Sequence, residues 1–476
     1  MPQGPEALAA QYAQQLPTLL PEQLAAAQRA VSSALAGEGA CVFLDAPGGT
    51  GKTYCLNAML RGVRGAGEVA IAVAYSGIAA TLLEGGRTFR SRFKVPLAGG
   101  AEASCRISAG SGLARLLQAA KLIVFDEAPM AHRHNLEAAE RALRTLCPGD
   151  GRPFAGKTVV LAGDFRQVLP VVKLGSQAQV LGASIKKSAL WAGFEVARLE
   201  TNVRARAAAD PEEGERRARW LLQLGDGALP ELDGRVALPA GSTIPATVDA
   251  AVARAFPKIS EPGGLEGDGA KSAVLAPCNA EVAELNAFAC DAFAGEATAC
   301  FSADELRGEG SALSAPAEHL NSIDVSELPP RELRLKPRMP VMLLRNADPG
   351  AGLCNGTRLR VLAVRGGKLL EAQILSGSGE GAIAYLPRAR LLPSDGEFPF
   401  EWSRTQFPVR PAFAMTIHKA QGQTLARAAV FLRSDVFSHG QLYVAASRVG
   451  DPANLRFAAP GGCGTALNVV YPGALA

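Results

Sequence analysis

Short apolar runs punctuate the first half of the chain, and a polar or glycine-rich stretch follows each of them. The runs cover residues 41–44, 69–74, 122–125 and 158–162. Runs of this length without charged residues are typical of strands buried inside a sheet. Between the first two runs, apolar residues recur instead at the i, i+3, i+4, i+7 positions of a helix. These residues are Leu56, Met59, Leu60 and Val63.

The second half of the chain continues the alternation of strand and helix patterns. A helix pattern ends at Gly227, and a strand pattern covers residues 273–276. Several short strand-like segments then follow one another before residue 400. We therefore predict an α/β fold with two domains. The predicted domains are residues 1–204, with a small insertion at about 85–112, and residues 205–476, with a β-rich insertion at about 336–400.

Composition narrows the class of protein. The 476 residues suffice for two to four domains, and 48% hydrophobic with 20% charged residues indicates a globular chain. A net charge of +4 is too small to demand a nucleic-acid partner. The nine cysteines form no CxxC pair and the five histidines have no metal-ligand spacing, so neither a zinc site nor a disulfide framework is expected.

The same pattern predicts no membrane segment and no targeting segment. No apolar run approaches the ~18 residues that a membrane span needs. Residues 1–28 contain no Lys or Arg and two Glu, unlike a signal peptide or an Arg-rich transit peptide. We expect no contact with a membrane.

The stretch after the first apolar run carries the strongest chemical signal. It reads Ala46-Pro47-Gly48-Gly49-Thr50-Gly51-Lys52-Thr53. A strand, a glycine-rich loop and a helix that opens with Lys-Thr form the context of a phosphate-binding loop. Lys52 would reach the β- and γ-phosphates of a nucleoside triphosphate, and the Thr53 hydroxyl would bind Mg²⁺. The alternative is a glycine-rich turn without a ligand.

The later apolar runs of the first half also end in residues suited to catalysis. Asp126 and Glu127 follow the third run, where they could hold Mg²⁺ and polarise the attacking water. Two carboxylates could instead cap a helix. Gln167 follows the fourth run and is a candidate γ-phosphate sensor, because its amide can both accept and donate. Arg204 is a candidate cation for the transition-state charge, although alone it would be a surface arginine.

Three other segments are less specific. Gln23, ahead of the glycine-rich loop, could bind the adenine edge, although an exposed helix glutamine is the ordinary interpretation. Small residues at 75–80 end the second run, where an open parallel sheet presents its ligand face. Residues 88–94 interleave three cations with two aromatics, which suits phosphate contacts and base stacking on a nucleic-acid strand. A loop with two packing aromatics is the alternative.

The last candidate block lies between residues 409 and 448. His418 and Lys419 suit phosphate contacts, although they could simply start a helix, and Gly422 would let the backbone approach a ligand. The segment 441–448 ends in Arg448.

This ordered series resembles the 5′→3′ DNA helicases of the PIF (petite integration frequency) family, in the RecD-like branch of helicase superfamily I. It is also similar to the helicase region of rolling-circle (Helitron) transposons. The resemblance covers about residues 20–471. Its most specific stretches are residues 76–83, 126–133, 163–171, 409–425 and 441–448.

The resemblance implies two RecA-like motor domains, with a β-barrel of the Src-homology-three type inserted in the second. It implies an enzyme that hydrolyses ATP with Mg²⁺, translocates 5′→3′ on single-stranded DNA and unwinds duplex. The implied partners are single-stranded and forked DNA, and the protein would act as a monomer. The implied roles are DNA replication, repair, recombination or telomere maintenance, in the nucleus or mitochondrion if the host is eukaryotic.

The resemblance also assigns roles to matching residues. The catalytic residues would be Lys52, Glu127, Gln167, Arg204 and Arg448, with Arg448 reaching the γ-phosphate. The ATP-binding residues would be Gln23, Pro47, Gly48, Gly49, Thr50, Gly51, Lys52, Thr53, Tyr54 and Gly422. The Mg²⁺ ligands would be Thr53 and Asp126. The DNA-binding residues would be Ser76, Gly77, Thr88, Arg90, Phe93, His418 and Lys419.

Three positions depart from the family pattern. Ala46 replaces a glycine, Arg90 stands where histidine is usual, and Ala446 stands where leucine is usual. None of these changes removes a catalytic group, although Arg90 puts the details of strand binding in doubt. Two alternatives therefore stay open: a catalytically weak DNA-binding remnant of a transposon helicase, and a translocase that does not separate duplexes.

Overall fold

The described chain forms two compact units. The computed structural model describes residues 4–96, 100, 103–206, 210–307, 323, 325, 327–377, 379–393, 398, 400–462 and 464–476. The first unit comprises Met1–Ala237, Val436–Pro452 and Leu467–Ala476, and the second comprises Leu238–Asp435 and Ala453–Ala466. The predicted division after residue 204 differs from this grouping and stays a prediction.

A six-stranded parallel sheet is the core of the first unit. Its order is β3-β2-β4-β5-β1-β6. The strands are β1 (Cys41–Asp45), β2 (Val69–Ala74), β3 (Arg87–Thr88), β4 (Ala120–Asp126), β5 (Thr158–Gly163) and β6 (Glu195–Arg198). The four apolar runs all lie in this sheet, which confirms the strand prediction. An antiparallel pair, β7 (Glu231–Leu232) and β8 (Arg235–Ala237), also belongs to this unit.

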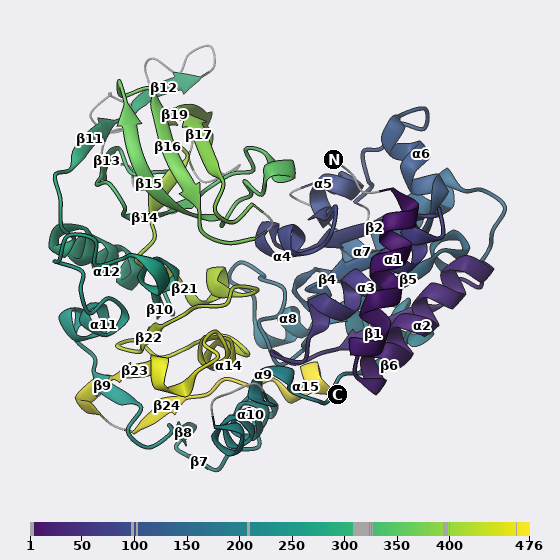
Figure 1. The fold of residues 1–476 in the computed structure, drawn as a ribbon, viewed down its shortest axis with the longest axis horizontal. Helices are drawn as coiled ribbons and strands as arrows, with labels where there is room; N and C mark the ends of the chain where they lie inside the picture. The colour runs from purple at the N-terminus through teal and green to yellow at the C-terminus, as the bar shows by residue number, and fades with distance from the viewer. Residues whose placement is uncertain are drawn as a thin grey trace. The chain divides into compact units, whose positions relative to one another are not determined.

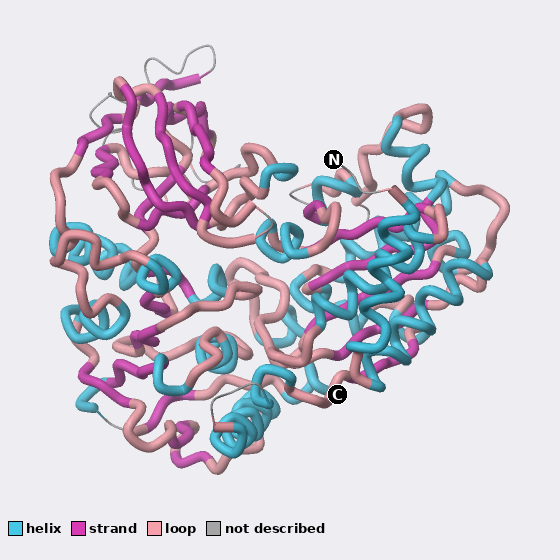
Figure 2. Tube along the Cα trace, in the orientation of Figure 1, coloured by secondary structure: helices cyan, strands magenta, loops and turns pink. Residues whose placement is uncertain are grey.

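Helices cover both faces of this sheet (Figure 2). Side chains alternate along a strand, so Val42 and Leu44 pack with α2 and α3 whereas Cys41 and Phe43 pack with α6 and α7. The helices are α1 (Pro5–Gln15), α2 (Pro21–Ala36), α3 (Lys52–Gly65), α4 (Gly77–Leu82), α5 (Phe89–Phe93), α6 (Gly112–Ala119), α7 (Arg133–Leu146), α8 (Gln177–Ala183), α9 (Val203–Arg206), α10 (Pro211–Asp226), α14 (Gln441–Ser447) and α15 (Pro472–Leu475).

Local sequence explains where the central helices begin and end. Proline occupies the first turn of α2 and α10, where its missing N–H costs no hydrogen bond. Gly37 and Gly227 end these helices with φ of +69° and +67°, a conformation that glycine adopts without strain. The predicted end of a helix at Gly227 is confirmed.

The second unit is built on a five-stranded parallel sheet with the order β21-β10-β22-β23-β9. The strands are β9 (Thr243–Pro245), β10 (Ala273–Ala276), β21 (Ala414–Thr416), β22 (Ala428–Phe431) and β23 (Leu455–Ala459). The helices α11 (Val248–Ala255) and α12 (Asn279–Ala292) pack on it. The predicted strand at 273–276 and the helix after it are confirmed.

The second unit also contains a β-rich region (Figures 1 and 2). Five antiparallel strands form one sheet, in the order β17-β16-β15-β14-β20. They are β14 (Pro340–Leu343), β15 (Arg358–Arg365), β16 (Leu369–Ile374), β17 (Ile383–Pro387) and β20 (Val409–Pro411). Smaller sheets contain β11 (Thr298–Phe301) with β13 (Glu332–Leu335), and β12 (Ala303–Arg307) with β18 (Ala389–Leu391) and β19 (Glu401–Gln406). The β-rich character predicted for this region is confirmed, and its Src-homology-three type stays a prediction.

Residues 436–452 leave the second unit and join the first. They carry α14 and connect β22 to β23, which are neighbouring parallel strands in the sheet of the second unit. The short strand β24 (Thr465–Leu467) follows β23. Within the described ranges, no helix is long and apolar enough to cross a membrane.

Candidate functional site

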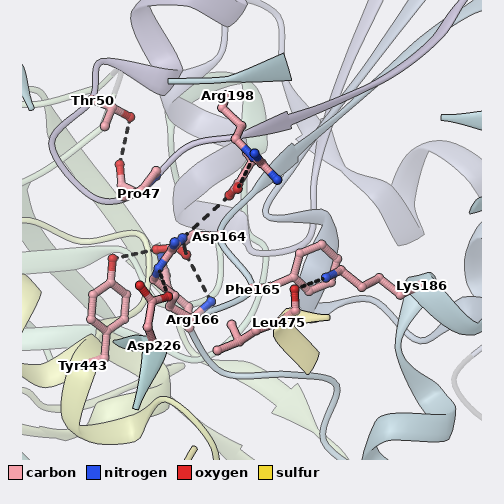
Figure 3. A network of polar contacts seen from close by, with 12 residues as sticks. Pro47, Thr50, Asp164, Phe165, Arg166, Lys186, Arg198, Asp226, Tyr443 and Leu475 are labelled. Carbon is pink, nitrogen blue, oxygen red and sulfur yellow. Dashed lines mark hydrogen bonds and ion pairs between the residues drawn. The ribbon is translucent and has the colours of Figure 1, made fainter. Parts of the chain in front are cut away.

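The glycine-rich loop lies between β1 and α3, as predicted. Gly49 and Gly51 have φ of +95° and +78°, which residues with a Cβ rarely adopt. A Cβ on Gly51 would also lie only 2.6 Å from Nε2 of Gln23. The Thr50 hydroxyl closes the turn by donating to the Pro47 carbonyl at 2.8 Å (Figure 3). The loop therefore brings backbone amides and the N-terminus of α3 together, which suits an anion.

Lys52 contacts both carboxylates at the end of β4. Its Nζ lies 2.7 Å from Asp126 Oδ1 and 2.7 Å from Glu127 Oε1. Burial opposes the charge on Lys52, but the two carboxylates more than offset that effect and raise its pKa. Burial raises the pKa of Asp126, Glu127 acts in the same direction, and Lys52 opposes them. The three side chains form a compact charged cluster at the glycine-rich loop.

The backbone at Glu127 has an uncommon conformation. Its φ of +53° and ψ of +37° are left-handed although the residue is not glycine, which costs on the order of 1–3 kcal/mol. Its N–H donates to Asp126 Oδ1 at 2.8 Å. The next strand supports this turn closely, since a Cβ on Gly163 would lie 2.3 Å from Cδ of Pro129. Such strain is found where the direction of a functional side chain is fixed by its surroundings.

The turn after β5 centres on a buried carboxylate, Asp164. Its Oδ2 accepts from the Tyr443 hydroxyl at 2.7 Å and from Gln167 Nε2 at 3.4 Å, and its Oδ1 accepts from the Arg166 backbone at 3.0 Å (Figure 3). Gln167 is itself 4% exposed. Among the described residues, its Oε1 has no hydrogen-bond partner. This amide oxygen is therefore an acceptor that the protein leaves unused.

Two arginines complete the cluster, of which Arg448 is buried and Arg204 is exposed. Arg448 follows α14 and donates from Nε to the Val444 carbonyl at 2.9 Å. Burial lowers the pKa of Arg448, Arg204 lowers it further, and Glu127 opposes both effects. The backbone N–H of Arg204 donates to the Gly49 carbonyl at 3.2 Å, and partial desolvation lowers the pKa of this side chain although part of it is exposed. The structure therefore places Arg204 and Arg448 in the surroundings of the loop and of Glu127.

Gln23 is 3% exposed, so it is not the exposed helix glutamine that served as the alternative. Its Oε1 accepts from the Leu20 backbone at 3.0 Å, and its Nε2 donates to the Thr50 carbonyl at 2.8 Å. This amide fastens the start of α2 to the glycine-rich loop, and its contact with adenine stays a prediction. Tyr54, in the first turn of α3, is exposed and hydrogen-bonds Thr18 through its hydroxyl at 2.6 Å. Its nucleotide contact also stays a prediction.

Sequence reasoning missed several residues that support the loop. Asn202 donates from Nδ2 to the Gly48 carbonyl at 3.2 Å, and a Cβ on Gly49 would lie 2.6 Å from Asn202 Oδ1. Arg217 donates to the Ala446 carbonyl at 2.9 Å at the end of α14. Asn202 lies two residues before the candidate Arg204, and this proximity could have indicated that Asn202 contacts the loop. No local pattern connects Arg217 to α14, because 229 residues separate the two partners.

The candidate DNA-binding residues of the first unit lie at short helices. The Ser76 hydroxyl caps α4 by accepting from the Ala79 backbone at 3.1 Å, and Gly77 is buried. Thr88 Oγ1 caps α5 in the same way, at 3.3 Å from the Ser91 backbone N. Arg90 is exposed on α5. The DNA contacts of these four residues stay predictions.

Phe93 is buried in the core. Its ring is 1% exposed and lies 4.8 Å from the Phe89 ring, which is stacked 4.4 Å from Phe125 of β4 (distances between centroids). The aromatic residues of this segment therefore pack in the core and leave almost no surface of Phe93 for base stacking, and its contact with DNA stays a prediction. The period of the short helix α5 turns both rings inward, whereas Arg90 and Lys94 stay exposed.

The remaining candidates belong to the second unit. His418 and Lys419 lie in a turn of 3₁₀-helix after β21, and burial lowers the pKa of His418. Gly422 has φ of +76°. Lys419 lines a cavity of about 380 Å³. Other polar residues of that cavity are Asn279, Asn286, Asp291, Glu332, Arg334, Arg410 and Thr416.

Fold and site together define the class of the protein. A buried parallel sheet, a glycine-rich loop ahead of a helix and an acidic pair on a nearby strand are the features of P-loop NTPases. The two units contain the parallel sheets of two RecA-like domains. The chain therefore has the fold and the phosphate-loop motif of P-loop NTPases with this two-domain architecture.

Comparisons with known proteins show which family two parts of the chain resemble. Residues 18–235 match the family described as PIF1-like helicase, and residues 318–364 match the 2B domain of the DNA helicase Pif1. Over these residues the chain is similar to PIF1-like helicases.

Individual relatives agree with this similarity. The human ATP-dependent DNA helicase PIF1 is 29% identical over 93% of this chain and 61% of its own length. The crystal structure of Pif1 helicase from Candida albicans matches with a TM-score of 0.66 at 23% identity, over 96% of this chain and 98% of that one. A Bacteroides Pif1 structure in complex with ADP-AlF3 and ssDNA has a TM-score of 0.63 at 22% identity, over 89% of both chains. The chain spans about three fifths of the length of the curated relatives it matches.

Proposed function

We propose that this protein is an ATP-dependent DNA helicase that translocates 5′→3′ on single-stranded DNA and unwinds duplex. The contact of Lys52 with Asp126 and Glu127 beside the glycine-rich loop supports it most directly. This cluster contains the cation, the metal-binding carboxylate and the water-activating carboxylate that ATP hydrolysis needs. The similarity to PIF1-like helicases supports DNA as the track and 5′→3′ as the direction.

Magnesium fits the residues at the loop. The Thr53 hydroxyl and the Asp126 carboxylate offer oxygen atoms, which Mg²⁺ prefers. Within the described ranges, no group of three or more His, Cys, Asp and Glu side chains could hold a metal alone. Phosphate oxygens and water would therefore complete the coordination, as is usual for Mg²⁺ with nucleotides. When bound, the metal would supply charge neutralisation on the phosphates.

Hydrolysis would then use the groups around the loop in distinct roles. Glu127 would accept a proton from the attacking water, and the unpaired Oε1 of Gln167 would help to orient that water. Lys52, Arg204 and Arg448 would stabilise negative charge as it develops on the phosphates. The contact of Lys52 with the carboxylates offsets part of their negative charge.

DNA would bind through the candidate residues of both units. In the first unit these are the Ser76, Gly77, Thr88 and Arg90 positions at the starts of α4 and α5. In the second unit they are His418 and Lys419, and the cavity beside Lys419 is large enough to accept part of a nucleotide. Phosphate contacts from arginine and lysine would make binding independent of sequence and sensitive to salt.

The wider expectations follow from this activity. Forked DNA is a natural substrate for a motor that follows one strand of a duplex, and action as a monomer is the simplest form of the proposal. Replication, repair, recombination and telomere maintenance are the family roles that such an enzyme could serve. A DNA substrate also implies the nucleus or the mitochondrion if the host is eukaryotic.

An ATPase assay with and without single-stranded DNA tests the proposal. Hydrolysis by the wild-type protein should rise many-fold with DNA. Glu127→Gln should lower the hydrolysis rate by about 10²–10⁴ because it removes the general base, while a fluorescent ATP analogue should still bind. Glu212→Gln, at an exposed position of α10, is the matched control and should match the wild-type protein. An ATPase indifferent to DNA would contradict the proposal, and a stimulated ATPase without strand separation would indicate a translocase.

A further inference from the structure

Tyr443 is a buried tyrosine of α14 with no role in the assignments above. Its side chain is 2% exposed, and its hydroxyl donates to Asp164 Oδ2 at 2.7 Å (Figure 3). Burial raises its pKa well above the ordinary value, and Asp164 acts in the same direction. The hydroxyl therefore keeps its proton and remains a donor to the carboxylate.

The acceptor of this bond also holds Gln167. Asp164 Oδ2 lies 3.4 Å from Gln167 Nε2. When Asp164 engages the amide nitrogen, the amide oxygen of Gln167 is directed away from the carboxylate. That oxygen has no hydrogen-bond partner among the described residues. The orientation of the Gln167 amide thus depends on the Asp164 carboxylate, and the hydrogen bond from Tyr443 holds that carboxylate in place.

Backbone contacts bring α14 very close to this turn. A Cβ on Gly440, which precedes α14, would lie 2.3 Å from the Arg166 carbonyl oxygen and 2.8 Å from the Gln167 carbonyl carbon. A glycine at φ +73° is what permits this approach. The His439 ring adds a contact of 2.8 Å between Nε2 and the Phe165 carbonyl. The start of α14 is therefore held against the turn by several contacts, of which Tyr443 makes the one to a charged group.

The other end of α14 reaches the glycine-rich loop. A Cβ on Gly48 would lie 3.9 Å from Cβ of Ser447. Arg448 follows directly and is 6% exposed. One short helix thus contacts the Gln167 turn through Tyr443 and carries the arginine beside the loop. Its flanking strands, β22 and β23, belong to the second unit, so the hydroxyl bond is one of the contacts that keep this segment in the first.

We propose that Tyr443 is a positioning residue that sets the Gln167 amide through Asp164 and holds the helix of Arg448 in register with the phosphate loop. It makes no contact with nucleotide and acts on turnover through these two residues. The inference rests on the proposed ATPase function. It predicts that the hydroxyl matters more for the rate of hydrolysis than for ATP binding, because Lys52 is unaffected and Gly48 is the loop residue whose backbone the hydroxyl reaches.

The test compares Tyr443→Phe with the wild-type protein in steady-state ATPase assays at saturating single-stranded DNA. Tyr443→Phe keeps the ring and removes only the hydroxyl. A hydrogen bond to a charged group contributes roughly tenfold to a hundredfold to an equilibrium, so kcat should fall by about tenfold or more. The KM for ATP should stay within about twofold. Tyr385→Phe removes the hydroxyl of a tyrosine that is 56% exposed on β17 and should behave as wild type.

Two further measurements separate positioning from a loss of folded protein. Asp164→Ala should lower kcat at least as far as Tyr443→Phe, because it removes the acceptor of Tyr443 and also that of Gln167 and Arg166. The double variant should lose little more than Asp164→Ala alone, because the Tyr443 bond is already absent there. Hydrogen–deuterium exchange should become faster at residues 441–448 in Tyr443→Phe, with α2 and α3 unchanged.

The outcomes are distinct. If the wild-type protein is active and Tyr443→Phe is equally active, the inference is overturned but the proposed function is not. The same holds if the loss of activity in Tyr443→Phe equals the fraction of that variant that is unfolded. Unchanged exchange at residues 441–448 would also overturn it. A wild-type protein without ATPase activity would overturn the proposed function and the inference with it.

Discussion

Each of the two units contains a strand, a turn and a helix in succession. The strands of the two successions are alike, whereas the turns and the helix starts differ. In the first unit, β1 leads into α3 through a loop with left-handed glycines, and α3 opens with Lys52 and Thr53. In the second, β10 leads into α12 through Pro277 and Cys278, and the residue ahead of α12 has an extended φ of −124°. The strand in each case is apolar and buried. The turn, not the strand, therefore separates a phosphate site from an ordinary connection.

The first turn of each helix reinforces the difference. Glu281 lies in the first turn of α12, is 3% exposed and accepts from the Ser434 backbone at 2.9 Å. A carboxylate at a helix N-terminus occupies the place where an anion would bind. α3 has no acidic residue there. The N-terminus of α3 is thus open to a bound anion, whereas the N-terminus of α12 already has the Glu281 carboxylate.

Lys52→Ala should have the largest effect on the site. It removes the cation that contacts Asp126 and Glu127, so two buried carboxylates lose their partner and the phosphates lose their ligand. Loss of one group that stabilises transition-state charge costs about 10²–10³ in rate, so ATP hydrolysis should fall at least that far. Lys121→Ala, at an exposed position of β4, is the control. An ATPase rate within tenfold of wild type would contradict the assignment of the loop.

Gly51→Ala tests whether backbone conformation distinguishes the two turns. The new Cβ would require a left-handed alanine and would meet Gln23 Nε2 at 2.6 Å. The strain should cost about 1–3 kcal/mol of folding stability, and displacement of the loop should lower ATPase activity by about a hundredfold. Urea unfolding and ATPase assays measure the two effects. Cys278→Ala in the second turn should change stability by less than about 0.5 kcal/mol; equal effects in both turns would remove the distinction.

His439 gives the phosphate-site unit a dependence on pH. The ring is 0% exposed, its Nδ1 accepts from the Tyr471 backbone at 2.9 Å, and burial lowers its pKa. Below the unfolded-state pKa of about 6.5, the unfolded chain binds a proton that the folded ring does not. Stability from this group is therefore complete above that pH and is lost as the pH falls toward the lowered folded value.

Thermal unfolding at pH 8 and pH 5.5 checks this effect. Wild-type protein should lose more stability between the two conditions than His439→Gln, by at most about 1.4 kcal/mol per pH unit. Parallel pH profiles for the two proteins would mean that the ring does not contribute.

Ala46→Gly should have the smallest effect. Ala46 is 1% exposed, its N–H donates to the Gly163 carbonyl at 3.0 Å, and it is not among the described residues with a positive φ. The family glycine is thus not needed for backbone conformation here. The substitution should cost about 0.5–1 kcal/mol of stability through chain entropy and alter ATPase activity only modestly. A large gain in activity would mean that this copy is catalytically impaired.

Features that depend on neighbouring residues could be predicted from the sequence. The core strands, the glycine-rich loop and the Asp126–Glu127 pair each follow from a local pattern, and the structure brings Lys52 to both carboxylates because β1 and β4 lie on either side of β5. The position of Gln167 shortly after β5 also follows from a local pattern, because an apolar run precedes it.

Features that depend on distant packing could not. Residues 88–94 have the composition of a nucleic-acid strand contact, but Phe93 packs with Phe89 in the core, and composition does not say which face of a short helix is buried. Tyr443 and Asp164 are 279 residues apart. A tyrosine in an apolar helix gives no sign of its partner, so only the tertiary structure could connect the two.

A strand-displacement assay tests the central claim most directly. Two duplexes of the same sequence would carry a single-stranded tail at either the 5′ or the 3′ end and would be incubated with ATP, Mg²⁺ and wild-type or Glu127→Gln protein. The account predicts that the wild-type protein separates the 5′-tailed duplex and not the 3′-tailed one, and that Glu127→Gln separates neither. Separation of the 3′-tailed duplex alone, or of neither duplex by a protein that hydrolyses ATP, would contradict it.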